Sequence, residues 1–577
     1  MRFCYLLILV YSISNFRAQL KKDYYDEGQS KLKSETDYYK GMPHGPYTEY
    51  YPSGKVSTKG FFNYGKEDST WTFYFEDGGK KACEHFVKGL KWGTNTYYFK
   101  SGKLSQITVY RNNLADSTWT SYYENGKIKS RENFVNGKKE GEWIYYFENG
   151  NLESKGNFEK DKQHGTVETR YPNGKPMRIQ NFCMGNPCDR WEEFYENGNP
   201  KFVKEYRDTT TLLWELWDPK ERHLISGGNG SLSASYDNGV VKAMGYYKNG
   251  LQDSTWRFFH ANGELDYEAN YRNGMLNGYY SSYYPNHKIK SEGNFTDNRK
   301  DGLWKFYTPE GQMEMQGTLR GDSREDKWIY YYKNGKVESE GLFSANQQNG
   351  TWSYYYSGGE KWRQGDYANG VKSGLWTTWF ENGNKVQEGP YVNGKEDGLW
   401  KSWWENGKPK DEGSFSAGQL TGHWKGWYPE GAENYEGYYN EKGAKTGEWK
   451  YYYENGKPRE ICNYVNGIKH GEYILWYEKG GFVDTKGQYS KGHQHGEWTY
   501  YFETGGISRV QNFKNGKLSG KSISYYPNAK VQSISHYTIL NDTRKGKSQS
   551  VPDGVWIYFD KNGNEISRST YVNGIRK

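Results

Sequence analysis

The sequence predicts an all-β protein: an elongated, single-layer antiparallel sheet built from stacked β-hairpin repeats of about 24 residues. Three observations lead to this prediction. Tryptophans recur every 24 residues at Trp328, Trp352, Trp376, Trp400 and Trp424. Within each period, β-favouring runs alternate with Asn-Gly turns, the strongest short-range signal for a hairpin. No stretch has the apolar spacing of a helix.

The composition favours a folded chain whose apolar contacts come from aromatic rings. Of the 577 residues, 18% are aromatic, while hydrophobic residues in total reach only 34%. Tyr, Trp and Phe must therefore supply most of the buried surface. The net charge of +8 comes from 78 basic and 70 acidic residues spread along the chain. This even mixture lacks the clustered Lys and Arg of a nucleic-acid surface, so we expect no nucleic-acid partner.

The period and its interruptions predict the organisation of the chain. Arg2 followed by a short apolar stretch is typical of a secretory signal peptide, which predicts export to the periplasm, the outer surface or the medium. No other stretch is apolar enough to suggest a membrane span. In chain order the predicted segments are a signal peptide (1–18), an N-terminal capping half-repeat (19–46), a first repeat array (47–206), an irregular junction (207–231), a second repeat array (232–540), and an insertion with the C-terminal repeat (541–577).

The pairing of the strands follows from the turns. If Asn334 and Gly335 form a two-residue turn, antiparallel pairing places Trp328 opposite Gly341. A glycine leaves room for the indole to lie across its partner strand. Folding the next turn in the same way puts Phe343 beside Trp352. We therefore expect one face of the sheet to carry a structural spine that includes Trp143, Gly156, Trp328, Gly341, Trp352, Trp376, Gly389, Trp400 and Gly413.

A second aromatic row is predicted on the opposite face. Side chains alternate along a strand, so the residue three places after each tryptophan position points away from the spine. Cross-strand packing that covers the sheet is one interpretation of these residues. The other is an exposed row that binds a partner, since a single-layer sheet has no second sheet to bury this face. The candidate binding residues are Tyr331, Tyr355, Trp379, Trp403, Trp427, Tyr452 and Trp476.

The cysteines suggest one local bridge and no metal centre. Cys183 and Cys188 bracket a turn, so a disulfide between them is feasible in an oxidising compartment; two free thiols are the alternative. A metal would need two further ligands, and none is evident nearby. Cys83 and Cys462 lie many repeats apart and cannot meet in a stacked array.

The sequence lacks the residue patterns of an enzyme. No phosphate-binding loop, zinc-protease helix or nucleophile elbow occurs. His44, His164, His470 and His495 each precede the glycine that begins a unit, which predicts a role in turn packing. Recurrent glutamates such as Glu340 repeat with the unit, so cross-strand pairing with Lys explains them better than catalysis. We expect no catalytic residue and no cofactor.

The repeating unit resembles a known family. Gly141-Glu-Trp143 with Tyr146-Phe-Glu-Asn-Gly150, and Gly447-Glu-Trp449 with Tyr452-Tyr-Glu-Asn-Gly456, are similar to the bacterial variant of the MORN repeat. The resemblance covers most of residues 40–577. It implies a sheet of stacked hairpins that serves as a scaffold, tether or interaction surface. Many bacterial members carry an antitoxin label, which implies neutralisation of a toxin by occlusion as an alternative.

We therefore expect an exported, non-enzymatic scaffold that binds a protein or a cell-envelope polymer through its aromatic row. This function predicts many similar weak sites and avidity. The antitoxin-like alternative predicts one tight site at an irregular segment such as residues 207–231. The sequence leaves the oligomeric state open, and it does not indicate membrane contact.

Overall fold

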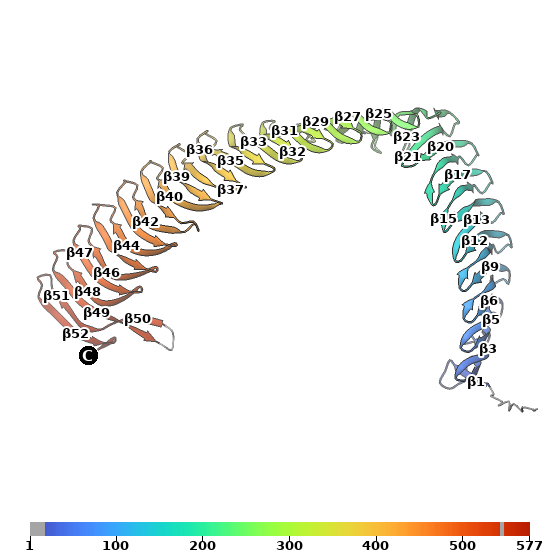
Figure 1. The fold of residues 1–577 in the computed structure, drawn as a ribbon, viewed down its shortest axis with the longest axis horizontal. Coiled ribbons are helices and arrows are strands. Elements are labelled where there is room, and N and C mark those ends of the chain that lie inside the picture. The colour runs from blue at the N-terminus through green and yellow to red at the C-terminus, as the bar shows by residue number, and fades with distance from the viewer. Residues whose placement is uncertain (1–17, 543–546) are drawn as a thin grey trace, which may run out of the picture. The chain divides into compact units, whose positions relative to one another are not determined.

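The computed structural model describes residues 18–542 and 547–577, in which every regular element is a β-strand (Figure 1). These residues form 53 strands of an antiparallel sheet, and no helix occurs among them. The all-β, hairpin-repeat architecture predicted from the sequence is therefore confirmed. Apart from its last residue, the predicted signal peptide lies outside the described residues.

The chain separates into two compact units. The first consists of the residues up to Glu264 together with Glu268–Met275, and the second of Leu265–Tyr267 together with the residues from Leu276 onward. The division does not fall in the segment 207–231, which continues the hairpin pattern. The strands of the first unit are β1 (Gln19–Tyr24), β2 (Leu32–Tyr39), β3 (Met42–Tyr50), β4 (Val56–Asn63), β5 (Lys66–Tyr74), β6 (Lys80–Val87), β7 (Leu90–Lys91), β8 (Gly93–Tyr98), β9 (Leu104–Arg111), β10 (Leu114–Ala115), β11 (Ser117–Tyr122), β12 (Ile128–Val135), β13 (Lys138–Tyr146), β14 (Leu152–Glu159), β15 (Lys162–Gln163), β16 (Gly165–Arg170), β17 (Pro176–Cys183), β18 (Asn186–Pro187), β19 (Asp189–Phe194), β20 (Pro200–Arg207), β21 (Thr210–Trp217), β22 (His223–Ser226), β23 (Asn229–Ser235), β24 (Val241–Lys248) and β25 (Leu251–Phe259).

The boundary between the units runs through β26 (Leu265–Arg272). The strands of the second unit are β27 (Met275–Tyr283), β28 (Ile289–Thr296), β29 (Arg299–Tyr307), β30 (Met313–Arg320), β31 (Ser323–Tyr331), β32 (Val337–Ser344), β33 (Gln347–Tyr355), β34 (Lys361–Ala368), β35 (Val371–Trp379), β36 (Lys385–Val392), β37 (Lys395–Glu396), β38 (Gly398–Trp403), β39 (Pro409–Ser416), β40 (Gln419–Trp427), β41 (Glu433–Tyr439), β42 (Lys445–Tyr452), β43 (Pro458–Val465), β44 (Ile468–Trp476), β45 (Val483–Ser490), β46 (His493–Tyr501), β47 (Ile507–Lys514), β48 (Lys517–Tyr525), β49 (Val531–Asp542), β50 (Lys547–Pro552), β51 (Gly554–Phe559), β52 (Glu565–Val572) and β53 (Ile575–Arg576).

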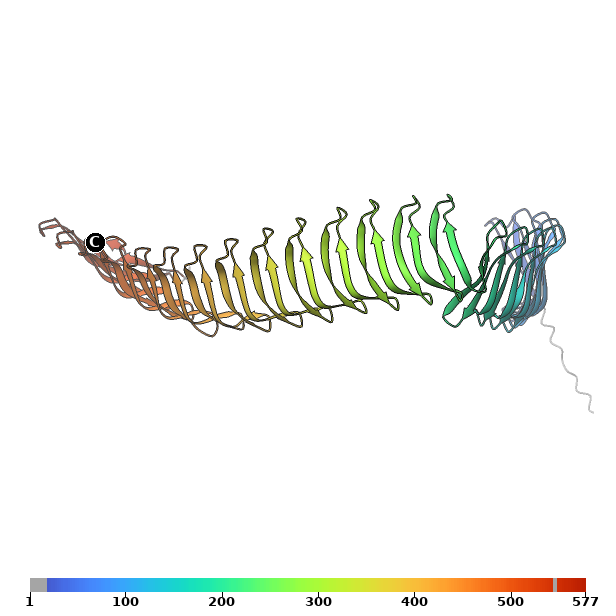
Figure 2. The same ribbon diagram turned by 90° about the horizontal axis from the view of Figure 1, so that it is seen from above.

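Within each unit, strands pair with the strands before and after them in the chain. In the second unit, for example, β31 pairs with β30 and β32, both antiparallel. Figure 2 shows the hairpins of this unit side by side, one after another. Contacts between repeats are therefore made mostly by residues of adjacent repeats, as in other repeat proteins.

A repeat has two turns that differ in structure although both contain Asn-Gly. The first turn follows the strand that carries the tryptophan, as around Asn334-Gly335, and the second follows the next strand, as around Asn393-Gly394. In the first turn, the amide of Gly335 donates to the carbonyl of Tyr332, and the amide of Tyr332 donates to the carbonyl of Lys336. This is a three-residue loop with Gly335 in the left-handed region at φ 82°. The predicted two-residue Asn334-Gly335 turn is therefore wrong.

The second turn is the two-residue form. Val392 pairs with Lys395 around Asn393 and Gly394, whose φ angles of 50° and 78° are those of a type I′ turn. Asn tolerates this left-handed conformation better than other side chains do.

The three-residue turn nevertheless leads to the predicted register. Tyr331 pairs with Val337, and the register then shifts by one residue between Tyr331 and Tyr330. The longer loop and this bulge compensate for each other. As a result, the structure pairs Trp143 with Gly156, Trp328 with Gly341, Trp376 with Gly389, and Trp400 with Gly413.

Three glycines of the spine, Gly341, Gly389 and Gly413, lie beneath the tryptophan of the following repeat. A Cβ added to Gly341 would come within 2.3 Å of Cδ2 in Trp352, and one added to Gly389 within 2.2 Å of Cδ2 in Trp400. The expectation that an indole covers its own register partner is therefore wrong at these glycines, whereas Gly156 does lie against its partner Trp143, at 3.0 Å from an added Cβ to Cζ2. The reason is a second register shift, between Glu340 and Leu342 on β32 and β33, which lets the indole of Trp352 reach back across the preceding strand.

The same shift provides a partner for the indole nitrogen. Nε1 of Trp352 donates to the carbonyl oxygen of Leu342 at 2.9 Å, and its ring meets Phe343 edge-on with centroids 5.2 Å apart. Edge-to-face rings at this distance attract each other beyond simple burial. The indole thus packs, covers the glycine and satisfies its polar atom. The same tryptophan-to-carbonyl bond recurs at Trp119, Trp191, Trp256, Trp304, Trp328, Trp376, Trp400, Trp424 and Trp498.

A ladder of hydrogen bonds joins the first turns of successive repeats. The hydroxyl of Tyr332 donates to the carbonyl of Tyr355, 23 residues further on, and Nδ2 of Asn334 donates to the carbonyl of Ser357. These bonds explain why Tyr-x-Asn-Gly repeats so strictly. The same tyrosine bond is made by Tyr51, Tyr123, Tyr171, Tyr236, Tyr284, Tyr356 and Tyr453.

The segments predicted to be irregular also form hairpins. β1 pairs with β2, and its exposed residues include Lys21 and Lys22, charges that are typical of an edge strand. Near the C-terminus, β49 and β50 pair between Tyr537 and Pro552 and form a longer hairpin where the sequence shows an insertion.

Candidate functional site

The candidate aromatic row is less exposed than the sequence suggests. All seven residues are half-buried at the strand ends next to the first turns. Neighbouring side chains of the same face cover them. The ammonium groups of Lys361, Lys385 and Lys425 lie 5.4 to 5.6 Å from the ring centroids of Trp379, Trp403 and Trp427. The row therefore presents ring edges between charged groups.

The tyrosines of the row are also engaged by polar neighbours. The hydroxyl of Tyr355 donates to Oε1 of Glu340 at 2.9 Å, and that of Tyr331 accepts from Nε2 of Gln316 at 2.7 Å. Burial, and then the bond to Glu340, raise the pKa of Tyr355. Burial likewise raises the pKa of Tyr452. The hydroxyls of Tyr355 and Tyr452 therefore remain neutral at ordinary pH.

Glutamates and lysines pair on the same face. We call this surface the Lys/Glu face; it consists of strand residues that alternate with the tryptophans. Glu340 lies 2.8 Å from the ammonium of Lys327, and Glu388 lies 2.6 Å from that of Lys385. The hydrogen bond from Lys327 lowers the pKa of Glu340. These carboxylates are ion-pair partners of lysines on the same face.

The Lys/Glu face also carries an apolar stripe that was not predicted from the sequence. Leu375 and Leu399 each directly precede a buried tryptophan, so alternation turns them outward, and they are 56% and 47% exposed. Leu342 directly follows a spine glycine and pairs with Lys327 across the strands. We define the apolar stripe as the exposed residues at these two positions in the second unit: Tyr279, Leu303, Leu342, Leu375, Leu399 and Tyr438.

A signal for the stripe was present in the sequence. The motif Gly-Leu-Trp occurs at Gly302–Trp304, Gly374–Trp376 and Gly398–Trp400. Its leucine stands one residue from the tryptophan and must therefore point to the other face. Single exposed apolar residues are ordinary on protein surfaces. Recurrence at the same two positions of the repeat distinguishes the residues of the stripe from such single residues.

The described hairpins match a known repeat model. A family model described as the MORN repeat variant matches thirteen segments: 43–64, 115–136, 139–160, 163–184, 190–208, 252–273, 276–297, 300–319, 327–345, 372–393, 396–417, 445–466 and 494–515.

The chain is a MORN-repeat protein. The resemblance noted in the sequence is thus confirmed, and with it the reading of the chain as a repeat scaffold. A stack of this kind offers a long surface on which the same group of side chains recurs.

Other comparisons add little about this MORN-repeat protein. No curated protein matches it. Similar solved structures include a complex of TcdB2–TccC3 with Cdc42, TcdB2–TccC3 without its hypervariable C-terminal region, and the Photorhabdus luminescens Tc holotoxin pore with a mutant TccC3. Sequence identity is 10–11%, and each match covers 96% of this chain but only 35% of the other, with TM-scores of 0.12–0.13. Scores this low relate neither the folds nor the functions.

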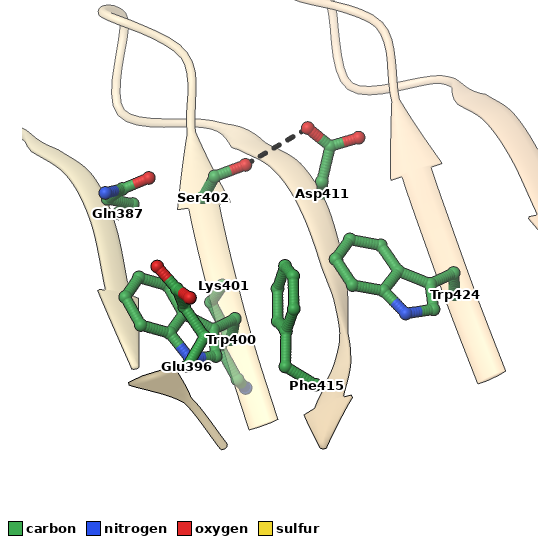
Figure 3. A pocket seen from close by; sticks show the side chains of 8 residues that line it. All are labelled: Gln387, Glu396, Trp400, Lys401, Ser402, Asp411, Phe415 and Trp424. Carbon is green, nitrogen blue, oxygen red and sulfur yellow. Dashed lines mark hydrogen bonds between the residues drawn. The ribbon is translucent and has the colours of Figure 1, made fainter. Parts of the chain in front are cut away.

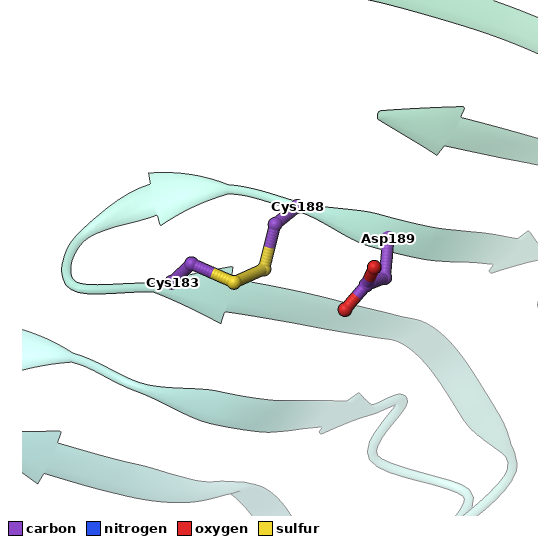
Figure 4. Close-up of side chains that lie close together, drawn as sticks. All are labelled: Cys183, Cys188 and Asp189. Carbon is purple, nitrogen blue, oxygen red and sulfur yellow. A yellow bond between two sulfur atoms is a disulfide. The ribbon is translucent and has the colours of Figure 1, made fainter. Parts of the chain in front are cut away.

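Cys183 and Cys188 of the MORN-repeat protein are joined by a disulfide across the turn between β17 and β18 (Figure 4). Asp189 lies close to the two sulfur atoms, but bridged cysteines do not ligate a metal as thiolates do. Cys83 and Cys462 are free, and burial raises the pKa of Cys462. Among the described residues, no helix is long and apolar enough to cross a membrane.

Three histidines of the MORN-repeat protein lie in or beside the strand that follows a second turn and contact the second turn of the next repeat. Nδ1 of His44 accepts from the backbone amide of Tyr64 at 3.3 Å, and Nδ1 of His470 accepts from that of Lys491 at 3.4 Å. His164 makes the equivalent contact with the amide of Met184. In each case the imidazole holds the turn of the following repeat, which is a structural role.

Proposed function

We propose that this MORN-repeat protein is an exported, non-enzymatic scaffold that binds a partner protein on its Lys/Glu face. The observation that carries the proposal is the apolar stripe. It places exposed leucines and tyrosines beside half-buried aromatic edges and paired charges. Apolar and aromatic anchors surrounded by polar groups are the usual composition of a protein interface.

The repetition favours binding through several similar contacts. Leu375 and Leu399 lie one repeat apart, and each has the same kind of neighbours on its strand. A partner that spans several repeats would gain affinity from many weak contacts. Such a surface suits an extended protein segment better than a small molecule, because it is a face of the sheet and not a deep cavity.

Two observations support export. The first residues have the pattern of a signal peptide. The bridge between Cys183 and Cys188 also suits a compartment where disulfides persist. An exported scaffold would meet its partner in the cell envelope or outside the cell.

A capture experiment with matched variants tests the proposal. The full chain would be immobilised and exposed to an extract of the envelope of its source, and bound proteins would be identified by mass spectrometry. A Leu375→Asp/Leu399→Asp variant should lose the partner. A control variant with Val371→Asp and Val392→Asp changes equally exposed apolar residues at the second turns and should retain it.

The outcomes separate the alternatives. Equal capture by both variants would refute the Lys/Glu face as the interface. A tight partner that is lost only when residues 207–231 are changed would instead favour the antitoxin-like alternative. Recovery of glycan strands without protein would point to a cell-envelope polymer as the ligand.

A further inference from the structure

A cavity of about 370 Å³ opens on the tryptophan face of the second unit, opposite the apolar stripe. Trp400, Phe415 and Trp424 form its aromatic wall (Figure 3). Its polar lining consists of Gln387, Glu396, Ser402 and Asp411, while the ammonium of Lys401 is paired with Glu412 at 3.3 Å.

The cavity exists because a ring is missing from the stack. Two residues after the tryptophan, other repeats carry an aromatic side chain, such as Phe306 or Tyr354, whose ring centroid lies 6.0 Å from that of its tryptophan. At this position stands Ser402, and the next repeat has Gly426. The flanking tryptophans are accordingly more exposed: Trp400 is 7% and Trp424 9% exposed, against 0–2% for Trp304, Trp352, Trp449 and Trp498.

A cation is missing from the same place. Four residues before the tryptophan, neighbouring repeats carry a lysine that lies over the indole. Nζ of Lys372 is 4.6 Å from the ring centroid of Trp376, and Nζ of Lys445 is 4.1 Å from that of Trp449. Lys300 lies over Trp304 in the same way, at 4.4 Å. The face of an indole attracts a cation placed at this distance.

At the cavity this position has the opposite charge. Glu396 stands four residues before Trp400, and Leu420 four residues before Trp424. Asp411 adds a second carboxylate. Among the described residues, the side chains that hydrogen-bond to Glu396 and Asp411 are hydroxyl groups.

Those hydroxyls hold the carboxylates in place. Tyr391 donates to Oε1 of Glu396 at 3.0 Å. Tyr435 donates to Oδ1 of Asp411 at 2.6 Å, and Ser402 donates to its Oδ2 at 3.2 Å. Two carboxylates and two indole faces thus surround a space that lysines of this same chain fill in other repeats.

We propose that this cavity binds an alkylammonium or guanidinium group from another molecule, namely a lysine or arginine side chain of a polypeptide. The group would occupy the position that Lys372 and Lys445 occupy over their own tryptophans. Stacking on the indoles and charge-assisted hydrogen bonds to Glu396 and Asp411 would hold it. The net charge of +8 opposes unspecific attraction of cations, so binding would require this local arrangement.

The test is a titration of the full chain, followed by saturation-transfer NMR. The probes are Nα-acetyl-lysine amide and Nα-acetyl-arginine amide, with the uncharged Nα,Nε-diacetyl-lysine amide for comparison. The two cationic probes should bind and the neutral one should not. Spermidine tests whether the cationic group comes from a polypeptide or from a free polyamine. A site for a polypeptide should bind the amino-acid amides more tightly than spermidine. Tighter binding of spermidine would overturn the assignment to a polypeptide.

Variants locate the site. Glu396→Lys restores the cation that the repeat carries elsewhere, so it should fold normally and weaken binding about tenfold or more. Asp411→Asn should weaken binding without adding a charge. Gln494→Lys introduces a lysine at the same position before Trp498 and should leave binding unchanged. Undiminished binding to the folded Glu396→Lys variant, or equal weakening by Gln494→Lys, would refute the proposal.

Discussion

At the scale of single residues, the stack depends on glycines that lie beneath a tryptophan of the next repeat. The residue types and the register were predicted correctly, yet Gly341, Gly389 and Gly413 were assigned to the wrong indole; Gly156 lies against its predicted partner Trp143. The error arose because pairing was counted from the turn alone. The register shift between Glu340 and Leu342, which moves the indole backwards, has no signature in the composition of the strands.

A double-mutant cycle on Gly341 tests this assignment. Gly341→Ala places a methyl group 2.3 Å from Cδ2 of the buried Trp352 and should cost about 1–3 kcal/mol of unfolding free energy. In a Trp352→Ala background the cost should nearly vanish, while in a Trp328→Ala background it should persist. Gly506→Ala, whose added carbon would meet only one atom at 4.0 Å, is the control in urea unfolding.

The pH dependence of stability can be traced to Tyr307. Burial, and then a hydrogen bond to Glu292 at 2.7 Å, raise the pKa of Tyr307 from 10.0 to about 12, and the bond from Tyr307 lowers the pKa of Glu292. The stability that Tyr307 contributes should be complete below pH 10 and lost as pH rises through about 12. The stability that ionised Glu292 contributes to the protein should be present above pH 4.5, the ordinary pKa of a glutamate, and lost as the pH falls below that value.

The measurement is the unfolding free energy of the wild type and Tyr307→Phe as a function of pH. The difference between them should be constant from about pH 5 to 10 and shrink on both sides. Tyr284→Phe is the control, because the Tyr284 hydroxyl donates to a backbone carbonyl that does not titrate in acid. A Tyr307→Phe difference that stayed constant down to pH 2 would contradict the role of Glu292.

At the scale of elements, two copies of the same dipeptide form different turns. Asn334 lies within a three-residue loop and uses its side chain, accepting from the amide of Lys336 at 3.0 Å and donating to the carbonyl of Ser357 at 2.8 Å. Asn393 has a left-handed backbone. The sequence could not distinguish the two turn types, because a two-residue turn and a three-residue turn followed by a bulge give the same pairing of the strands.

Glycine substitutions should distinguish the two turns. Asn393→Gly keeps the left-handed conformation at no steric cost and should be nearly neutral. Asn334→Gly removes two hydrogen bonds and should cost about 1 kcal/mol. Thermal unfolding of the two variants side by side would show the difference, and equal effects would mean that the turns are equivalent after all.

The candidate surface was also predicted only in part. Alternation identified the aromatic row, but it could not show that Lys361 and Lys385 of adjacent strands lie against its rings. The apolar stripe was overlooked because its leucines stand inside the run that was assigned to the spine. The periodicity of the sequence predicts on which face of the sheet a side chain lies. How exposed that side chain is depends on the side chains of the neighbouring strand.

At the scale of the whole molecule, contacts within each unit join mostly strands that are neighbours in the chain. A disturbance should therefore remain where it is introduced. Cys188→Ser removes the bridge across the turn of β17 and β18, and faster amide exchange should be confined to β17, β18 and β19. Hydrogen exchange followed by mass spectrometry measures this directly. Faster exchange spread over distant repeats would show a cooperative fold instead.

The tyrosine ladder described above has a consequence for protein engineering. The bond is kept when the chain between its partners changes in length: it spans 22 residues from Tyr195, 24 from Tyr428 and 33 from Tyr526. In the last case the chain accommodates the additional hairpin of β49 and β50. Foreign loops of similar length could therefore be grafted at the second turns, and several grafts at successive repeats would display peptides at regular intervals.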